Sequence, residues 1–147
     1  MGKMKKVNKH WGYELWIADG SVTPYAFKEI FFKAGKRTSL QVHKYKIETN
    51  YVSSGTGIMI CSKEPLDIDA FLEQGMTNDE IEEYVESFDV IMLEPGVSVT
   101  VMPGTVHRVI ATTDLVFFET SSTELDDVIR LQDDANRQHG RIDDEHR

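Results

Sequence analysis

The sequence predicts an all-β fold, an antiparallel barrel or sandwich that carries one short helical insertion. Short apolar runs recur along the chain and are separated by turn residues such as Asp19-Gly20, Pro95-Gly96 and Pro103-Gly104. Evenly spaced short strands with such turns are typical of closed all-β folds. The alternating pattern is interrupted once, over residues 61–88, where a helical spacing replaces it. A single domain over residues 1–147 is expected, because this length suffices for one core and is short for two.

The first group of strands is expected within residues 10–60. Residues 1–9 should form a flexible lead. Trp11 and Trp16 lie an odd number of residues apart, so a regular strand would turn them to opposite faces, one inward and one toward an edge or a partner subunit. Strands are predicted at residues 10–17, 25–33, 38–43 and 58–61, with a further extended run opening at Glu48.

Residues 61–88 carry apolar side chains at helical spacing. The pattern breaks at Gln74-Gly75, and Thr77 followed by Glu80 forms a capping-box signature for a second helix. We therefore expect two short helices laid across an edge or the mouth of the barrel. The segment either packs against the barrel or acts as a substrate lid, and the first reading is preferred because no residue in it is obviously catalytic.

Strands are expected to resume over residues 89–121 and to be followed by a tail over residues 122–147. Alternating acidic and basic residues in the tail, with few apolar anchors, predict that it wraps the exterior to about Leu131 and frays beyond, leaving His139 and His146 solvated. The four strands are predicted at residues 90–93, 97–102, 106–111 and 115–120.

Three polar side chains within residues 35–55 have a spacing suited to metal ligands. Gln41 and His43 are two residues apart, so a strand directs both to one face. Glu48 opens the next run after a short connection, close enough for its carboxylate to return to that face. Imidazole, carboxylate and amide oxygen together suit a borderline divalent ion. An ordinary hairpin with a polar face would give the same three residues.

His107 adds a candidate ligand from the second half of the chain. It follows the Pro103-Gly104 turn at the start of an apolar run, and this position fixes its direction. Ligands from two such distant segments would meet only inside one shared barrel. The predicted metal ligands are Gln41, His43, Glu48 and His107, with zinc as the expected ion and manganese, nickel or iron suited to the same donors.

These residues resemble the motifs of the cupin superfamily. The second cupin motif is matched loosely by Gly96, Pro103, Gly104 and His107, and the first is matched without a gap by Gly35, Gln41, His43, Glu48 and Gly55. The chain also resembles the cupin domain of type II mannose-6-phosphate isomerases and mannose-1-phosphate guanylyltransferases, in phrases such as Trp11-Gly12-Tyr13-Glu14 and Asp126-Asp127-Val128-Ile129-Arg130. The resemblance implies a cupin jelly-roll antiparallel β-barrel, here with a short two-helix insertion.

The resemblance also implies the isomerisation of an aldose to a ketose, with a sugar phosphate such as mannose-6-phosphate as the substrate and a divalent ion stabilising an enediol. Glu119, on a strand expected to face the barrel, is the candidate base that moves the proton between C1 and C2. Lys33, Lys46 and Arg108 are candidate partners of a phosphate or an enediolate. Each of these four residues has an alternative role as a surface or ion-paired side chain.

Two other functions compete with isomerisation. A metal-dependent dioxygenase is one, because an iron ion with an open position binds oxygen, although Gln41 in place of a histidine weakens that reading. A non-catalytic sugar-binding cupin is the other. All three functions take a small carbohydrate or a similar small molecule as the partner.

Composition and charge limit the partners further. A net charge of −9 disfavours nucleic acid, whose phosphates require a positive surface. No apolar run approaches the roughly 20 residues of a membrane helix, and no leader pattern is seen, so a cytoplasmic protein is expected. Cys61, in an apolar run, is expected to be a small buried hydrophobe. Trp16, Phe27 and Phe31 are candidates for the contact of a homodimer.

Overall fold

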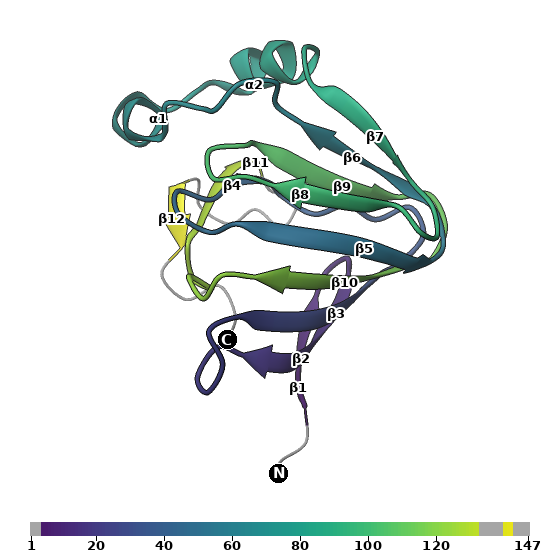
Figure 1. Ribbon diagram of the computed structural model, residues 1–147. Coiled ribbons are helices and arrows are strands. Elements are labelled where there is room, and N and C mark those ends of the chain that lie inside the picture. The colour runs from purple at the N-terminus through teal and green to yellow at the C-terminus, as the bar shows by residue number, and fades with distance from the viewer. Residues whose placement is uncertain (1–3, 133–139, 143–147) are drawn as a thin grey trace.

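Two antiparallel sheets, each of six strands, make up the body of the protein in the computed structural model, which describes residues 4–132 and 140–142 (Figure 1). The first sheet has the order β1-β2-β3-β10-β5-β8 and the second has the order β12-β11-β4-β9-β6-β7. Neighbouring strands in these orders are often distant in sequence, as in a jelly roll. The predicted all-β fold with a two-helix insertion is therefore confirmed.

The first sheet consists of β1 (Lys5–Lys9), β2 (Gly12–Asp19), β3 (Ala26–Phe32), β5 (Glu48–Ser54), β8 (Ser98–Val101) and β10 (Leu115–Ser121). The second consists of β4 (Leu40–Val42), β6 (Gly57–Cys61), β7 (Asp89–Leu93), β9 (His107–Ala111), β11 (Val128–Gln132) and β12 (Gly140–Ile142). The helices are α1 (Ile68–Gln74) and α2 (Asn78–Val85). No helix in the described ranges is both long and apolar enough to cross a membrane.

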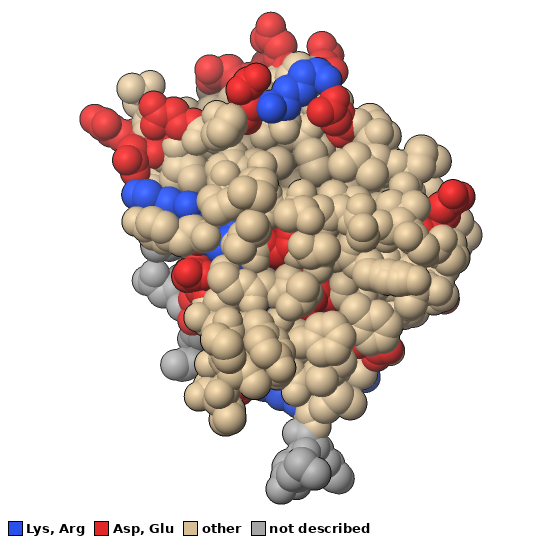
Figure 2. All heavy atoms as spheres, in the orientation of Figure 1, with Lys and Arg blue, Asp and Glu red and all other residues tan. Residues whose placement is uncertain are grey.

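The two helices cover the outer face of the second sheet. Thr77 caps α2 in the predicted capping box, in which its side chain accepts from Glu80 N and Glu80 accepts from Thr77 N. Acidic side chains gather over this helical part in Figure 2, where they keep the outer sides of the helices solvated. The buried cluster beneath the helices joins Ile68, Phe71, Ile81 and Phe88 to Leu40, Val42, Ile60, Val106, Ile129 and Leu131.

A second apolar cluster fills the space between the two sheets. Within it Trp11 stacks on Phe32 with ring centroids 4.6 Å apart, and Phe32 lies 4.8 Å from Phe117. Trp11 and Trp16 are both buried, so the expectation that they point to opposite faces was wrong. Trp11 lies in the turn before β2 begins and does not follow the alternation of the strand.

Strands β1, β11 and β12 were not predicted. In β1 only Val7 is buried. An edge strand with one packed face needs few apolar residues, so its sequence shows little apolar alternation. In β11, residues 128–131 are all buried, so the pattern does not alternate in polarity as a half-exposed strand would. These residues belong to the second sheet and do not wrap its exterior. The expectations of a frayed tail and of solvated His139 and His146 fall on residues 133–139 and 143–147, outside the described residues.

Candidate metal centre

Strand β4 turns Gln41 and His43 into the space between the sheets. Leu40 and Val42 are fully buried against the helical side of the sheet, so the residues that alternate with them face the interior. In the pairing of β4 with β9, Gln41 lies directly opposite His107. Cross-strand partners share a face, and both motifs therefore reach the same interior, as the sequence predicted.

A turn at residues 102–105 links the two motifs. Thr105 N donates to Met102 O at 3.1 Å, and Gly104 in the third position has a φ of +87°, the left-handed value that favours glycine in such a turn. Gly104 N also donates to His43 O at 2.8 Å. The turn that precedes His107 is thus bonded to the backbone of His43, which keeps the two imidazoles in register.

His43, Glu48 and His107 converge on one point. Glu48 Oε1 lies 3.0 Å from His43 Nε2 and 3.8 Å from His107 Nε2. One potential ligand atom from each residue lies within 4.8 Å of the other two. Ligand bonds of about 2.0–2.2 Å allow two donors on one ion to be up to about 4.4 Å apart, so little movement is needed to bind an ion. All three residues are buried.

The hydrogen bonds of the two imidazoles leave the nitrogens that face Glu48 available. His43 Nδ1 lies 2.6 Å from Asp127 O, and His107 Nδ1 lies 3.0 Å from Thr105 O. Because a carbonyl only accepts, each Nδ1 carries the proton and each Nε2 has a lone pair. His43 Nε2 is buried and, although near Glu48, makes no well-formed hydrogen bond. A divalent ion fits this donor set, because it would satisfy an otherwise orphaned nitrogen.

The local charges keep the ligands in their metal-binding protonation states. Burial would raise the pKa of Glu48, but the nearby charge of Lys46 outweighs it and holds the pKa well below its usual value. Burial lowers the pKa of His107 to about 4, against the opposing attraction of Glu48. At neutral pH the cluster therefore presents a carboxylate and a neutral imidazole, as a metal site requires.

Gln41 lies beside this cluster as the fourth predicted ligand. It lines both cavities next to the cluster, and its Oε1 accepts a hydrogen bond from Ser39 Oγ at 3.0 Å. Its position opposite His107 brings it to the site. Direct coordination by its amide oxygen stays a prediction.

Glu119 and Lys46 form a buried ion pair beside the three ligands. Lys46 Nζ lies 3.1 Å from Glu119 Oε1 and 3.9 Å from Glu48 Oε1. Burial and the negative charge of Glu48 raise the pKa of Glu119 to about 7, against the opposing effect of Lys46. Although burial acts against it, the pKa of Lys46 is raised by Glu119 and Glu48. Glu119 can therefore exchange a proton near neutral pH while Lys46 stays charged.

Arg108 and Lys33 are not brought to the site. His107 and Val109 line a small cavity between the sheets, so Arg108 between them projects to the other face of β9. There its Nε donates to Thr38 O at 2.8 Å and its Nη1 donates to Gln132 Oε1 at 3.1 Å. Lys33 is exposed after the end of β3 and lines neither cavity. Neither side chain is placed to hold an enediolate at the cluster.

Several polar residues of the site were missed by sequence reasoning. Glu14 and Lys28 line a small cavity beside the ligands as a buried pair 3.5 Å apart. Asn50 Nδ2 donates to Glu48 Oε2 at 3.0 Å. A usable signal existed for Lys28, because it alternates with the inward apolar residues Ala26 and Ile30. A charged residue in a core register marks a paired or functional group.

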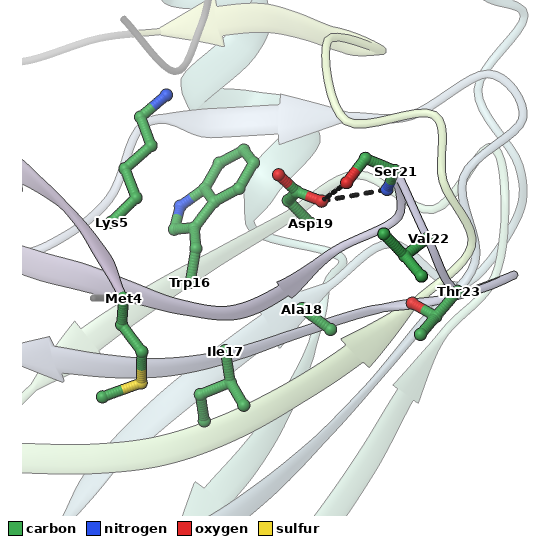
Figure 3. Close-up of a pocket in the computed structure, with 9 residues that line it drawn as sticks. All are labelled: Met4, Lys5, Trp16, Ile17, Ala18, Asp19, Ser21, Val22 and Thr23. Carbon is green, nitrogen blue, oxygen red and sulfur yellow. Dashed lines mark hydrogen bonds between the residues drawn. The ribbon is translucent and has the colours of Figure 1, made fainter. Parts of the chain in front are cut away.

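Two small cavities of about 50 Å³ each adjoin the cluster. The one lined by Lys28 and Lys46 is called the outer cavity, and the other combines apolar residues such as Phe32 and Met59 with Glu48 and His107. Neither is lined by α1 or α2, so the insertion packs on the sheet without reaching the site. A larger cavity of about 340 Å³ lies at the start of β1 and the end of β2 (Figure 3). Its carboxylate, Asp19, already accepts from Ser21 N and Oγ. We place the centre at the ligand cluster because chemistry depends on converging groups more than on volume.

Comparison with known families identifies the chain. The family model for D-lyxose isomerase matches residues 15–145. The chain belongs to the D-lyxose isomerase family. Comparison with curated protein sequences returns no match. In this member of the D-lyxose isomerase family, the carboxylate and two imidazoles at the centre of the barrel are the candidate ligands of a divalent ion.

Solved structures similar to this member of the D-lyxose isomerase family share the cupin fold. The capsular polysaccharide assembling protein CapF from Staphylococcus aureus matches with a TM-score of 0.62 and 15% identity over 90% of this chain and 32% of its own. The chain thus spans about a third of the length of CapF. A cupin-like protein from Thermotoga maritima has a TM-score of 0.59 and 17% identity over 90% of this chain and 88% of its own. Oxalate decarboxylase from Bacillus subtilis has a TM-score of 0.58 and 17% identity over 79% of this chain and 26% of its own.

Proposed function

We propose that the protein is a divalent-metal-dependent aldose–ketose isomerase that converts a neutral sugar of the D-lyxose type to its 2-ketose. The observation that carries the proposal is the position of Glu119, a buried carboxyl with a pKa near 7, beside the cluster of His43, Glu48 and His107. An ion bound there supplies Lewis-acid polarisation of the sugar oxygens at C1 and C2. The family match supports the reaction type.

In this proposal the chain's own residues move the proton and hold its charge. Glu119 takes the proton from C2 of the open-chain aldose and returns it to C1, and the hydroxyl proton moves from O2 to O1, so that atoms balance. Lys46, 3.1 Å from Glu119, favours the anionic form of that carboxyl before it takes the proton from C2, and adds positive charge beside the developing enediolate while Glu119 holds the proton. Asn50 holds Glu48 in place through a 3.0 Å hydrogen bond.

The charges in the outer cavity support a neutral sugar over a sugar phosphate. Three lysines line it: Lys28 and Lys46 are buried beside Glu14 and Glu119 respectively, and Lys9 is half-buried. The charges of Lys28 and Lys46 are therefore largely balanced before a substrate arrives, whereas a phosphate group recruits uncompensated cations. D-lyxose has the same configuration at C2, C3 and C4 as D-mannose, so D-mannose is proposed as a second substrate. Mannose-6-phosphate, implied by the earlier resemblance, stays a prediction.

A substrate panel tests the proposal. With metal-loaded protein, D-lyxose and D-mannose are expected to give ketose product with a kcat/KM at least about tenfold above that of mannose-6-phosphate, a difference of about 1.4 kcal/mol in transition-state binding. Ketose formation is followed by a coupled reductase assay, and elemental analysis identifies the ion, for which zinc is proposed. Higher turnover of mannose-6-phosphate would reverse the substrate assignment. Oxygen uptake without ketose formation would favour a dioxygenase, and binding without turnover a sugar-binding cupin.

We also propose a homodimer formed through the outer face of the first sheet. Tyr13 stacks on Phe31 with centroids 5.1 Å apart, and Phe27 lies 5.9 Å from Phe118, all on the side of β2, β3 and β10 that faces away from the barrel. Figure 2 shows this face with few charges. Trp16, expected as part of the contact, is buried inside and is unsuited to it. Apolar faces of this kind are typical of subunit interfaces.

Light scattering is expected to give twice the 16.8 kDa mass of one chain. Phe118→Lys is expected to return the mass to that of a monomer, because a two-fold contact would bury the new charge twice. Val90→Lys, an exposed site on β7 of the other sheet, serves as the control and should leave the dimer intact. A monomeric wild type would reject the interface.

A further inference from the structure

The connection between β10 and β11 lies against the loop that joins two of the proposed ligands. This loop, residues 44–47, runs from His43 to Glu48. At one end of it, Ser122 N donates to Ile47 O at 3.0 Å and Ile47 N donates to Ser122 Oγ at 3.1 Å. The loop is therefore held from outside by a segment that is distant in sequence.

At the other end, one carboxylate accepts three successive backbone donors of the loop. Asp127 Oδ1 accepts from Lys44 N at 3.1 Å, and Asp127 Oδ2 accepts from Tyr45 N at 2.6 Å and from Lys46 N at 3.0 Å. Asp127 is itself buried, with 7% of its surface exposed. Charge-assisted hydrogen bonds of this kind are among the strongest in proteins, so the backbone path over these residues is set by Asp127.

The backbone of the same residue holds a ligand. Asp127 O accepts the hydrogen bond of His43 Nδ1 at 2.6 Å, which fixes the ring and leaves Nε2 directed at Glu48. The side chain and the carbonyl of Asp127 thus act on different parts of the site. The carbonyl acts on a proposed ligand, whereas the carboxylate acts on the loop that carries Lys46.

We propose that Asp127 is a positioning residue with two separable roles. Its carbonyl orients His43, and its carboxylate shapes residues 44–46 so that Lys46 Nζ lies 3.1 Å from Glu119. Lys46 is only 4% exposed, and a shift of its backbone cannot be absorbed by a side chain confined in the cavity wall. The kinetic consequence of the second role rests on the proposed isomerase function, whereas the structural consequences do not.

The test uses Asp127→Asn in the full chain, because this change keeps the carbonyl and the size of the residue but removes the charge and one acceptor. Titration with zinc alone is expected to give a Kd within about threefold of wild type, since the His43 contact is retained. Values of kcat for D-lyxose should fall roughly 10–100-fold, the effect typical of lost outer-shell partners, with KM within about threefold. The amide signals of Lys44, Tyr45 and Lys46 should shift upfield in NMR spectra as their hydrogen bonds weaken.

Coupling to Lys46 separates positioning from general stability. If Asp127 acts through Lys46, adding Asp127→Asn to Lys46→Met should lower kcat less than twofold further, whereas independent effects would multiply. Asp126→Asn changes the exposed neighbour of Asp127 and should match wild type in every readout. Should Asp127→Asn not fold, Ser122→Ala removes the hydroxyl that accepts from Ile47 N, while the backbone bond from Ser122 N to Ile47 O stays, and its kcat should fall with an unchanged zinc Kd.

Three results would overturn the inference: an unchanged kcat in both loop variants, an Asp127→Asn loss that multiplies with that of Lys46→Met, or unshifted amides at residues 44–46. A zinc Kd that rises in proportion to the fall in kcat would overturn the separation of the two roles. Failure of the proposed function is distinguishable, because an inactive wild type would reject the isomerase while the zinc titration and the amide shifts still test Asp127.

Discussion

Replacing Glu48 by glutamine is expected to weaken zinc binding by more than about 100-fold and to abolish isomerase turnover. Loss of an outer-shell partner alone costs about 10–100-fold in metal affinity, and Glu48 is the only charged ligand in the cluster of His43, Glu48 and His107. The amide is nearly the same size, so the cavity is preserved. Isothermal titration with zinc and the D-lyxose assay measure the two effects.

Glu14→Gln is the matched control for this change. Glu14 is a buried carboxylate that lines the same cavity, with 7% of its surface exposed against 5% for Glu48, but it does not belong to the ligand cluster. Its amide variant should bind zinc within about threefold of wild type. Equal zinc affinity in Glu48→Gln and wild type would contradict the metal centre and with it the proposed chemistry.

Glu119→Gln is expected to lower kcat by about 10²–10⁴-fold, the contribution of a positioned acid–base group, while zinc still binds. The amide keeps a contact with Lys46 but cannot take the proton from C2. Lys46 loses only one of its two carboxylate neighbours in this variant. Glu48, 3.9 Å away, still balances the charge of Lys46. The protein should therefore stay folded, and a circular dichroism melt checks this.

The pH dependence of kcat/KM follows from the same residue. Burial and the charge of Glu48 raise the pKa of Glu119 to about 7 without a bound ion, and an ion that neutralises Glu48 would lower it. As pH falls through that pKa the base becomes protonated, so kcat/KM should decline on the acid side at or below about pH 7. Glu119→Gln should lose this acid limb.

Glu29→Gln is the control for the Glu119 change. Glu29 lies on β3 opposite Phe118 of β10, on the outer face of the sheet, and its amide variant should keep both kcat and the acid limb. An active Glu119→Gln with an unchanged pH profile would show that another group moves the proton, and the proposed role of Glu119 would then be withdrawn.

The fold class, and the part of the site that depends on local spacing, could be predicted from the sequence. Gln41 and His43 are two residues apart on one strand, so their spacing places both side chains on one face. That this face is the interior follows from the packing of Leu40 and Val42 against the helical layer, which the spacing does not show. His107 follows a Pro-Gly turn, which restricts its direction wherever the strand is placed. The alternation of side chains along a strand and the residue types of a turn are local properties, so they can be recognised without a tertiary structure.

Which distant groups complete the site depends on the pairing of strands that lie far apart in sequence. Arg108 adjoins His107 in sequence, yet its side chain lies on the opposite face of β9. Asp127 is distant in sequence from residues 44–46, yet its carboxylate accepts hydrogen bonds from their backbone. Glu14 and Lys28 became a buried pair because β2 and β3 turn both inward. These contacts form because strands that are distant in sequence pair with each other. The free energy of burying a charge depends on the partner that the fold brings to it, and a local sequence pattern does not identify that partner.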